Sequence, residues 1–474
     1  MNAMNFTSPR RLLVVAAVML FAGCAVGPNY HRPAVQTPEQ FRFATSAATN
    51  SLGDLPWWQV FDDPVLQELI RVALTNNYDL KKAVARVEQA RNAAAGTRAP
   101  FLPQINYGGQ AGRGRNAVFN NPASLGGETK SSALLDLSAT WEIDFWGRLR
   151  RQSESAQAQY LASKEVRRGV MITVVSQVAS SYFQLQELDE ELQILQSATN
   201  AYAGTCRIFS DRRANGVASK LETDRAFAAL AGAQAAIPNL ELQIATTENA
   251  LNVLLGRLPG PVARGSRRQQ HLPPPAIPTG LPSELLRRRP DVLAAEQSLV
   301  AANASIGTSV ANFFPRLGLT TMMGNVSPEL SAFTAGSANA WNVGATLAGP
   351  LFQGGALRAQ YHTAQAQFDE ARANYEQTVL MSFQEVADAL ITRQKLATIS
   401  VYQAQAAVAL TSAVQLSTDR YLNGKSDYDE VLQAQQALYP TQLAEVQAQL
   451  GELLAVVKLY KALGGGWQMP EQGK

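Results

Sequence analysis

Two long proline-free stretches constrain this 474-residue chain more than any other feature. They cover residues 147–215 and 355–423, each is 69 residues long, and the second has no glycine after its first position. A continuous helix of that length extends about 100 Å, far beyond the diameter of a small domain. In the second stretch apolar side chains recur at helical spacings, namely Phe368, Ala371, Tyr375, Val379, Val386 and Leu390. We therefore expect coiled-coil helices, with an ordinary hairpin of a soluble bundle as the alternative.

The chain also repeats itself at an offset of about 208 to 212 residues. Asn215–Val217 aligns with Asn423–Lys425, and each Asn-Gly is typical of a helix end that leads into a new helix. Each half therefore reads as helix, two strands, long helix, tight turn and helix. The expected repeat 1 is 76–258, with strands at about 104–115 and 133–145 and helices at 147–215 and 219–255. The expected repeat 2 is 291–474, with strands at about 315–325 and 340–351 and helices at 355–423 and 426–463. Residues 259–290, rich in Pro and Arg, are expected to link the halves as a loop.

The strands have the pattern of a membrane barrel. Apolar and polar side chains alternate without a break from Leu135 to Phe145, about the length of a tilted transmembrane strand. In a barrel the apolar set faces lipid, while Asp136, Glu142 and Asp144 face a watery lumen; a one-sided soluble sheet would give the same alternation. Four strands cannot close a barrel, and an open edge is not tolerated in lipid. We expect an α+β membrane protein whose subunits share one barrel, of eight strands for two chains or twelve for three.

The amino terminus has the features of a secretory signal peptide followed by a lipid attachment site. Arg10 and Arg11 precede an apolar run, Leu12–Ala22, that is too short to span a bilayer and fits a secretory signal peptide over residues 1–23. The run leads into Gly23-Cys24, which resembles a bacterial lipobox and predicts lipidation of Cys24. The alternative is an ordinary signal peptide with Cys24 as a free thiol. Ala25 is not Asp, and by resemblance to sorted lipoproteins this favours the outer over the inner membrane. Residues 24–75 are expected to form the lipid-anchored segment and part of an equatorial belt.

Composition and motifs argue against several other functions. A net charge of +3 and the absence of a polybasic face make nucleic acid an unsuitable partner. Two cysteines and three scattered histidines leave little material for a metal site, and we expect neither a cofactor nor an enzyme. Gly424-Lys425-Ser426 imitates the end of a phosphate-binding loop, but Asp419 stands where the first glycine would be. The acids over 187–191 are expected on a solvated helix surface, and Arg287–Arg289 among belt charges.

Six segments carry a resemblance to a known family, the outer-membrane efflux factors, in the TolC-like branch of NodT-type lipoproteins from tripartite RND efflux systems. The segments are Cys24–Pro33, Trp57–Leu66, Leu286–Val292, Tyr421–Gly424, Val431–Gln435 and Leu459–Trp467. The resemblance implies a homotrimer with a twelve-stranded barrel in the outer membrane, continued by a twelve-helix tunnel through the periplasm. It also implies a periplasmic adaptor and an inner-membrane RND-type pump as partners. The expected function is a passive exit duct for drugs or other small toxic compounds. An exit duct for type I peptide or protein secretion, and a purely structural periplasm-spanning lipoprotein, are the alternatives.

The residues of greatest functional interest lie at the two helical turns. Three copies of the acids just past the turns would converge at a constriction, although acids there also suit helix N-termini. The resemblance implies a periplasmic gate at Tyr421, Glu222 and Glu430, and we expect Asp427 there as well because it belongs to the same cluster of acids. It implies adaptor docking at the turns, through Asn215, Gly216, Val217, Asn423, Gly424 and Lys425. Ser426 stands where a familiar member of the family has a basic gating residue, and Gln433 stands where an acid is common.

Overall fold

The computed structural model describes residues 25–44, 51–115, 129–265, 279–280, 282–327, 333–334 and 336–467. The chain divides into two compact units. Unit 1 consists of Met1–Ala34, Arg86–Ser163 and Ala294–Tyr375, and unit 2 of Val35–Ala85, Lys164–Leu293 and Glu376–Lys474. The expected signal peptide and Cys24 lie outside the described residues.

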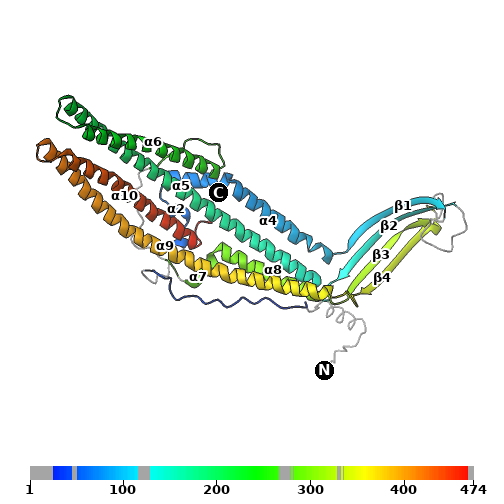
Figure 1. Ribbon diagram of the computed structural model, residues 1–474. Helices are drawn as coiled ribbons and strands as arrows, with labels where there is room; N and C mark the ends of the chain where they lie inside the picture. Colours follow the sequence, from blue (N-terminus) through cyan, green and yellow to red (C-terminus); the bar gives the residue numbers. More distant parts are fainter. Residues whose placement is uncertain are drawn as a thin grey trace, which may run out of the picture. The chain divides into compact units, whose positions relative to one another are not determined.

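Unit 1 contains one antiparallel sheet, with its strands in chain order (Figure 1). The strands are β1 (Gln104–Arg115), β2 (Thr129–Ile143), β3 (Arg316–Ser327) and β4 (Asn339–Ala348). Within the described residues, β1 and β4 each pair with one strand only, so both edges of the sheet are open.

The strand register sorts side chains onto two different faces. One row of cross-strand partners is apolar, and all its members are more than half exposed in the single chain: Tyr107, Leu137, Met323 and Trp341. Because neighbouring residues of a strand point to opposite faces, rows of the other face alternate with it. One of those rows contains Gln104, Thr140, Thr320 and Gly344. The alternation in the sequence thus becomes an apolar face and a face of polar and small residues.

Two strands end earlier than their expected bounds. β2 ends at Ile143 rather than 145, because the Asp144 carboxylate accepts hydrogen bonds from the backbone N–H groups of Leu149 and Arg150, both at 2.9 Å. Asp144 thereby serves the start of the next helix instead of the strand. β4 ends at Ala348 rather than 351, because Pro350 has no N–H for a strand ladder.

Four long helices form two hairpins of equal dimensions. α5 (Arg148–Ala214) and α9 (Ala356–Leu422) have 67 residues each, and α6 (Lys220–Leu254) and α10 (Tyr428–Ala462) have 35 each. In Figure 1, α6 folds back along α5, and α10 along α9. Across the described parts of the chain, no helix has an apolar stretch long enough to cross a membrane.

Shorter elements complete the two units. They are η1 (Leu52–Asp54), α2 (Trp57–Val60), α3 (Pro64–Asn76), α4 (Tyr78–Gly96), η2 (Ala99–Phe101), α7 (Pro282–Arg288), α8 (Pro290–Ala311) and η6 (Gly336–Ala338). The helix α7 lies inside the stretch 259–290, for which we expected a loop with little regular structure of its own. Its formation is consistent with the proline at its first position, which is pre-shaped for a helix start.

The core of unit 2 corrects the expectation for the acids of α5. Glu187 and Glu191 are only 5% and 6% exposed rather than solvated. Glu191 accepts a hydrogen bond of 2.8 Å from the side chain of Gln447 on α10. Asp189 forms an ion pair of 2.9 Å with Arg264, from the segment after α6. These acids therefore join α5 to neighbouring elements of the same unit.

Candidate functional site at the helical turns

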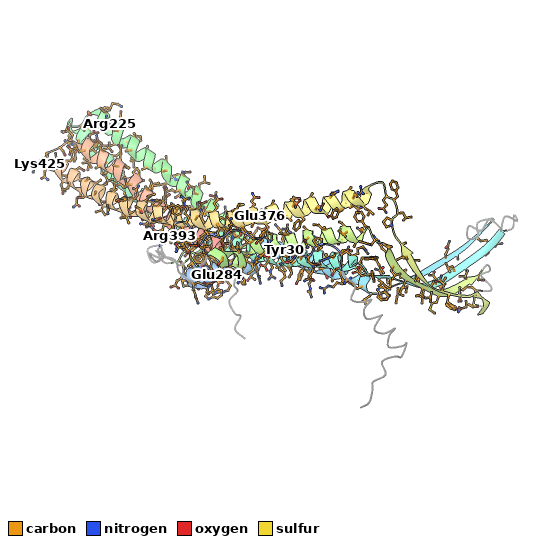
Figure 2. The ribbon with its side chains drawn as sticks, turned by 90° about the horizontal axis from the view of Figure 1, so that it is seen from below. Tyr30, Arg225, Glu284, Glu376, Arg393 and Lys425 are labelled. Carbon is orange, nitrogen blue, oxygen red and sulfur yellow. The ribbon has the colours of Figure 1, made fainter. Side chains whose placement is uncertain are left out.

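Both long helices end in the same hydrogen-bonded turn. Gly216 and Gly424 have positive φ angles of 73° and 68°, a conformation that glycine adopts without strain. The N–H of Val217 donates to the carbonyl of Arg212, and that of Lys425 to the carbonyl of Arg420, both at 2.8 Å. This is the Schellman arrangement. All six residues proposed for adaptor docking are exposed, and Figure 2 shows Arg225 and Lys425 at the same end of the helices.

The two turns lead into their next helices differently. Before α6, the Ser219 hydroxyl accepts from the backbone N–H of Glu222 at 3.2 Å, and the Glu222 carboxylate accepts from the N–H of Ser219 at 2.7 Å. This reciprocal capping box lowers the pKa of Glu222, chiefly through the backbone hydrogen bond from Ser219. Before α10, Asp427 is the N-cap, but its side chain makes no capping hydrogen bond. The Ser426 hydroxyl is enclosed and has no hydrogen-bond partner among the described residues.

Tyr421 joins the two hairpins. Its hydroxyl accepts a hydrogen bond from Nη1 of Arg212, whose guanidinium also lies 5.1 Å from the ring centroid. The ring is edge-on to Tyr428 at 5.0 Å, and Tyr428 is hydrogen-bonded to Thr205 of α5. Burial raises the pKa of Tyr428 to about 12. The surrounding apolar cluster includes Ala198, Tyr202, Phe209, Ala226, Ala233, Val431 and Leu432.

The acids near the turns have basic neighbours in the same chain. Glu430 lies 3.6 Å from Arg420, and Asp429 lies 3.1 Å from Arg225. Over residues 211–225 and 419–430 there are seven acidic and six basic side chains. The turn region therefore has a small excess of negative charge in each chain rather than a purely acidic surface.

The sequence reasoning did not single out the arginines of this region. Arg212 and Arg420 each stand three residues before an Asn-Gly, so they occupy equivalent positions in the two repeats. That repeated Arg-x-x-Asn-Gly spacing is the signal that could have identified them. Among the described residues, no group of three or more His, Cys, Asp or Glu is arranged to hold a metal ion.

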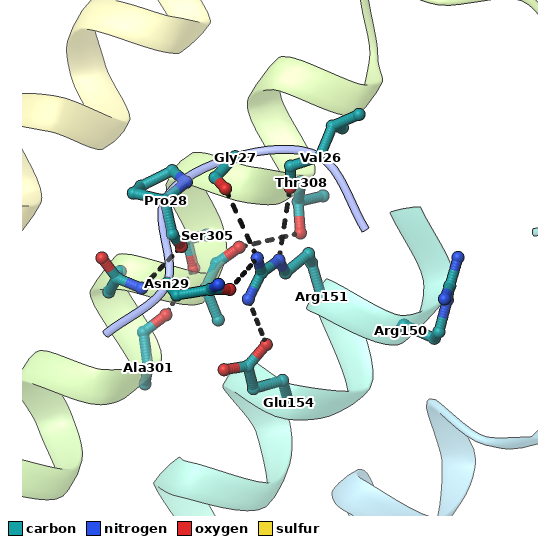
Figure 3. Close-up of polar contacts among 12 residues, drawn as sticks. Val26, Gly27, Pro28, Asn29, Arg150, Arg151, Glu154, Ala301, Ser305 and Thr308 are labelled. Carbon is teal, nitrogen blue, oxygen red and sulfur yellow. Dashed lines mark hydrogen bonds and ion pairs between the residues drawn. The ribbon is translucent and has the colours of Figure 1, made fainter. Parts of the chain in front are cut away.

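A second polar site, in unit 1, holds the segment that follows Cys24 (Figure 3). Arg151 is 5% exposed and donates to the carbonyls of Val26 (3.3 Å) and Gly27 (3.4 Å) and to the Asn29 side chain (2.7 Å). It also forms an ion pair with Glu154 at 2.8 Å. The N–H of Val26 donates to the carbonyl of Trp146 at 3.0 Å. The residues just after Cys24 are thereby fixed at the junction between β2 and α5.

Comparisons with known proteins agree over almost the whole chain. Residues 69–257 and 281–465 match the family described as outer membrane efflux protein. The cation efflux system protein CusC of Escherichia coli is 32% identical over 97% of this chain and 100% of CusC. The toluene efflux pump outer membrane protein TtgC of Pseudomonas putida is 33% identical over 96% of this chain and 95% of TtgC.

Solved structures show the same likeness. The outer-membrane channel OprN superposes with a TM-score of 0.86 at 30% identity, covering 94% of this chain and 100% of OprN. The open state of the Neisseria gonorrhoeae MtrE outer membrane channel gives 0.85 at 30% identity, covering 95% and 100%.

Proposed function

The chain belongs to the outer membrane efflux protein family, and from that premise we propose that three copies of it form one exit duct. The protein is an outer-membrane efflux channel of the kind that serves tripartite efflux systems. In the proposed assembly, a twelve-stranded barrel crosses the outer membrane and continues into a helical coiled-coil tunnel in the periplasm. An RND-type pump in the inner membrane and a periplasmic adaptor deliver the cargo. The duct itself is passive and performs no catalysis.

The two-faced sheet carries this proposal. Its apolar row, from Tyr107 to Trp341, suits contact with lipid tails, and its polar row, from Gln104 to Gly344, suits a watery lumen. An unpaired strand edge in lipid would cost several kcal/mol for each unsatisfied backbone group. The open edges of β1 and β4 therefore require partner strands, which other copies of the chain can supply.

Three copies suit a duct better than two. An eight-stranded barrel has an interior that side chains nearly fill. Twelve strands, four from each of three chains, enclose a wider lumen that solutes can pass. Because the chain belongs to the outer membrane efflux protein family, we also favour the homotrimer that its resemblance to that family implies.

A packing contact between the repeats supports closure by further copies. Trp146, at the end of β2, stacks on Phe314 with 4.5 Å between ring centroids, and its indole N–H donates to the Pro315 carbonyl at 2.9 Å. The equivalent corner after β4 presents Leu351 and Phe352, both almost fully exposed. The segment equivalent to Phe314 contains Leu102, which is 69% exposed. Where β4 of one copy meets β1 of the next, these side chains would repeat the contact between the halves.

The anchor and the gate are parts of the same proposal. We place a lipid on Cys24, because the Arg151 site holds the following residues at the junction of barrel strand and long helix. We place the periplasmic gate at Tyr421, Glu222, Glu430 and Asp427, which lie beside the exposed turns. The adaptor would contact the turns themselves.

The relatives differ in cargo at nearly equal similarity. CusC is named for cations at 32% identity and TtgC for toluene at 33%. We therefore propose that the pump selects the cargo, and that this chain exports small toxic compounds without strong selection of its own. The polar sheet face argues against a merely structural lipoprotein, since a structural strut needs no lumen.

One pair of measurements tests the proposal. Light scattering of the detergent-solubilised protein should give the protein mass of three chains, and the same sample should open ion-conducting channels in planar bilayers. A stable, folded monomer would contradict the shared barrel. A trimer without conductance would support the structural alternative.

A further inference from the structure

A cavity of about 490 Å³ lies in unit 2, where the end of α3 and the start of α4 face α5 and the carboxyl-terminal segment. Its volume is within the range of sites that bind small molecules. The cavity is lined by Leu74, Thr75, Asn77, Leu80, Lys81, Val84, Arg167, Arg168, Met171 and Trp467.

Half of the residues that line the cavity are apolar. Leu74, Leu80 and Met171 are buried core residues, at most 9% exposed. Val84 and the Trp467 ring add further apolar surface, and half of the Val84 side chain remains exposed. A hydrocarbon body bound here would remove this surface from water.

The charged side chains that line the cavity are all cationic. Lys81, Arg167 and Arg168 line it, and no acidic residue is among the described residues that do. Arg168 pairs with Glu165 at 2.7 Å and lies over the Trp467 ring at 4.7 Å, while the Lys81 ammonium lies over the Tyr78 ring at 4.9 Å. The Nε of Arg167 is enclosed and has no hydrogen-bond partner among the described residues.

We propose that this cavity binds an amphiphile with one anionic head group, of the alkyl carboxylate class. The head would accept hydrogen bonds from Arg167 and Lys81, and the apolar body would lie against Leu80, Met171 and Trp467. An enclosed guanidinium N–H without an acceptor favours an anion over a neutral head, because a charge-assisted hydrogen bond satisfies it best. A neutral alcohol of the same length would bury the same apolar surface but offer no charge. The inference does not rest on the proposed function.

Trp467 provides a reporter within the cavity. The full-length protein in a neutral maltoside detergent is titrated with 11-bromoundecanoate, whose bromine quenches tryptophan fluorescence on contact. The matched probe is 11-bromoundecanol, which enters micelles but has no charge. The signal of interest is the part of the quenching that disappears in Trp467→Phe. We expect this part to saturate with the carboxylate and to be absent with the alcohol.

Charge variants test the head-group contact. Arg167→Gln and Lys81→Gln should each weaken carboxylate binding about tenfold, as expected for the loss of one charge-assisted hydrogen bond. Arg86→Gln is the control, because Arg86 is an exposed cation on α4 that does not line the cavity. Unchanged size-exclusion elution shows that a variant is folded, and Lys81→Gln, at an exposed position, remains informative if Arg167→Gln does not fold.

Any one of three quenching results would overturn the inference. They are equal quenching by the carboxylate and the alcohol, no effect of Trp467→Phe, or no weakening in a folded charge variant. Competition separates a free amphiphile from a membrane lipid. Decanoate should displace the probe, whereas displacement by lysophosphatidylglycerol alone would assign the cavity to a phospholipid and contradict the carboxylate class.

Discussion

The hydroxyl of Tyr421, at the end of α9, accepts a hydrogen bond from Arg212, at the end of α5. The Arg212 guanidinium also lies 5.1 Å from the centroid of the Tyr421 ring. The two long helices belong to different hairpins of the same chain, so this pair ties the hairpins together next to the exposed turns.

Loss of this bond should make the channel easier to open. Tyr421→Phe removes a hydrogen bond from a charged guanidinium, worth about 1.5 to 3 kcal/mol in each subunit, which shifts a closed–open equilibrium by about ten- to hundredfold per subunit. Combination with Glu222→Gln, which also weakens the start of α6, should raise the resting conductance in planar bilayers further. Tyr402→Phe is the control, because Tyr402 is an exposed residue of the same helix. Unchanged conductance in the double variant would show that Tyr421 is not part of a gate.

The acids beside the turns should give the pore a modest preference for cations. Glu222→Gln combined with Glu430→Gln should reduce it, and salt should weaken it in the unmodified channel as the Debye length falls below about 8 to 10 Å. We expect the preference to be small, because Glu430 lies near Arg420 and the region is almost charge-balanced. Reversal potentials measure it, with Glu241→Gln, an exposed acid further along α6, as the control. An unchanged reversal potential in the double variant would mean that the acids only cap helices.

The pH dependence of this preference follows from the lowered pKa of Glu222. An unfolded chain titrates a glutamate at a pKa of about 4.3. A carboxylate whose pKa is lower in the folded protein stabilises the fold fully at pH values above that unfolded pKa. This stabilisation is lost as the pH falls through the folded pKa. The cap of α6 and the charge of Glu222 should therefore persist at about pH 5 and disappear only in more acidic solution. Reversal potentials recorded across this window report the charge. A transition centred above about pH 5 would exclude Glu222 as its source.

The anchor prediction concerns Cys24. Cys24→Ala should leave an unlipidated precursor and lower the amount of protein in the outer membrane, although the substitution leaves all four strands of the sheet unchanged. Mass spectrometry of the unmodified protein should find a mature terminus at Cys24 that carries a lipid. A mature terminus at any other residue, without a lipid, would refute the prediction.

The contact between copies can be tested with disulfides. In a Cys206→Ser background, Leu102→Cys with Phe352→Cys should give oxidised, covalently linked trimers on denaturing gels, because the repeat relationship brings these positions together between subunits. Leu258→Cys with Phe352→Cys is the control, since both side chains are exposed but the repeat predicts no contact. Absence of the link in a sample that scatters as a trimer would reject the corner contact alone. A monomeric sample would reject the assembly itself.

Signals carried by neighbouring residues were sufficient for most of the fold. Three signals act through the local backbone: a proline-free run, a glycine at a positive φ angle and an unbroken two-residue alternation. The long helices, their turns and the strands could therefore be predicted from the sequence. The same holds for Ser219 and Glu222, which are three residues apart and cap one helix. The family was also recognisable, because its segments occur in order along the chain.

Partners distant in the sequence were decided only by tertiary structure. Arg289 reads as one of three belt charges, yet it is buried and bonded to Asp291, Glu385 and the Ala462 carbonyl. Arg212 gains its role from Tyr421, and Arg151 from the segment after Cys24. The sequence does not distinguish a charged side chain in water from one that is buried and paired with a distant carboxylate. Desolvation and pairing depend on which helices pack together. The periodic pattern of the chain therefore determined its elements, and only their packing decided which charges hold those elements in place.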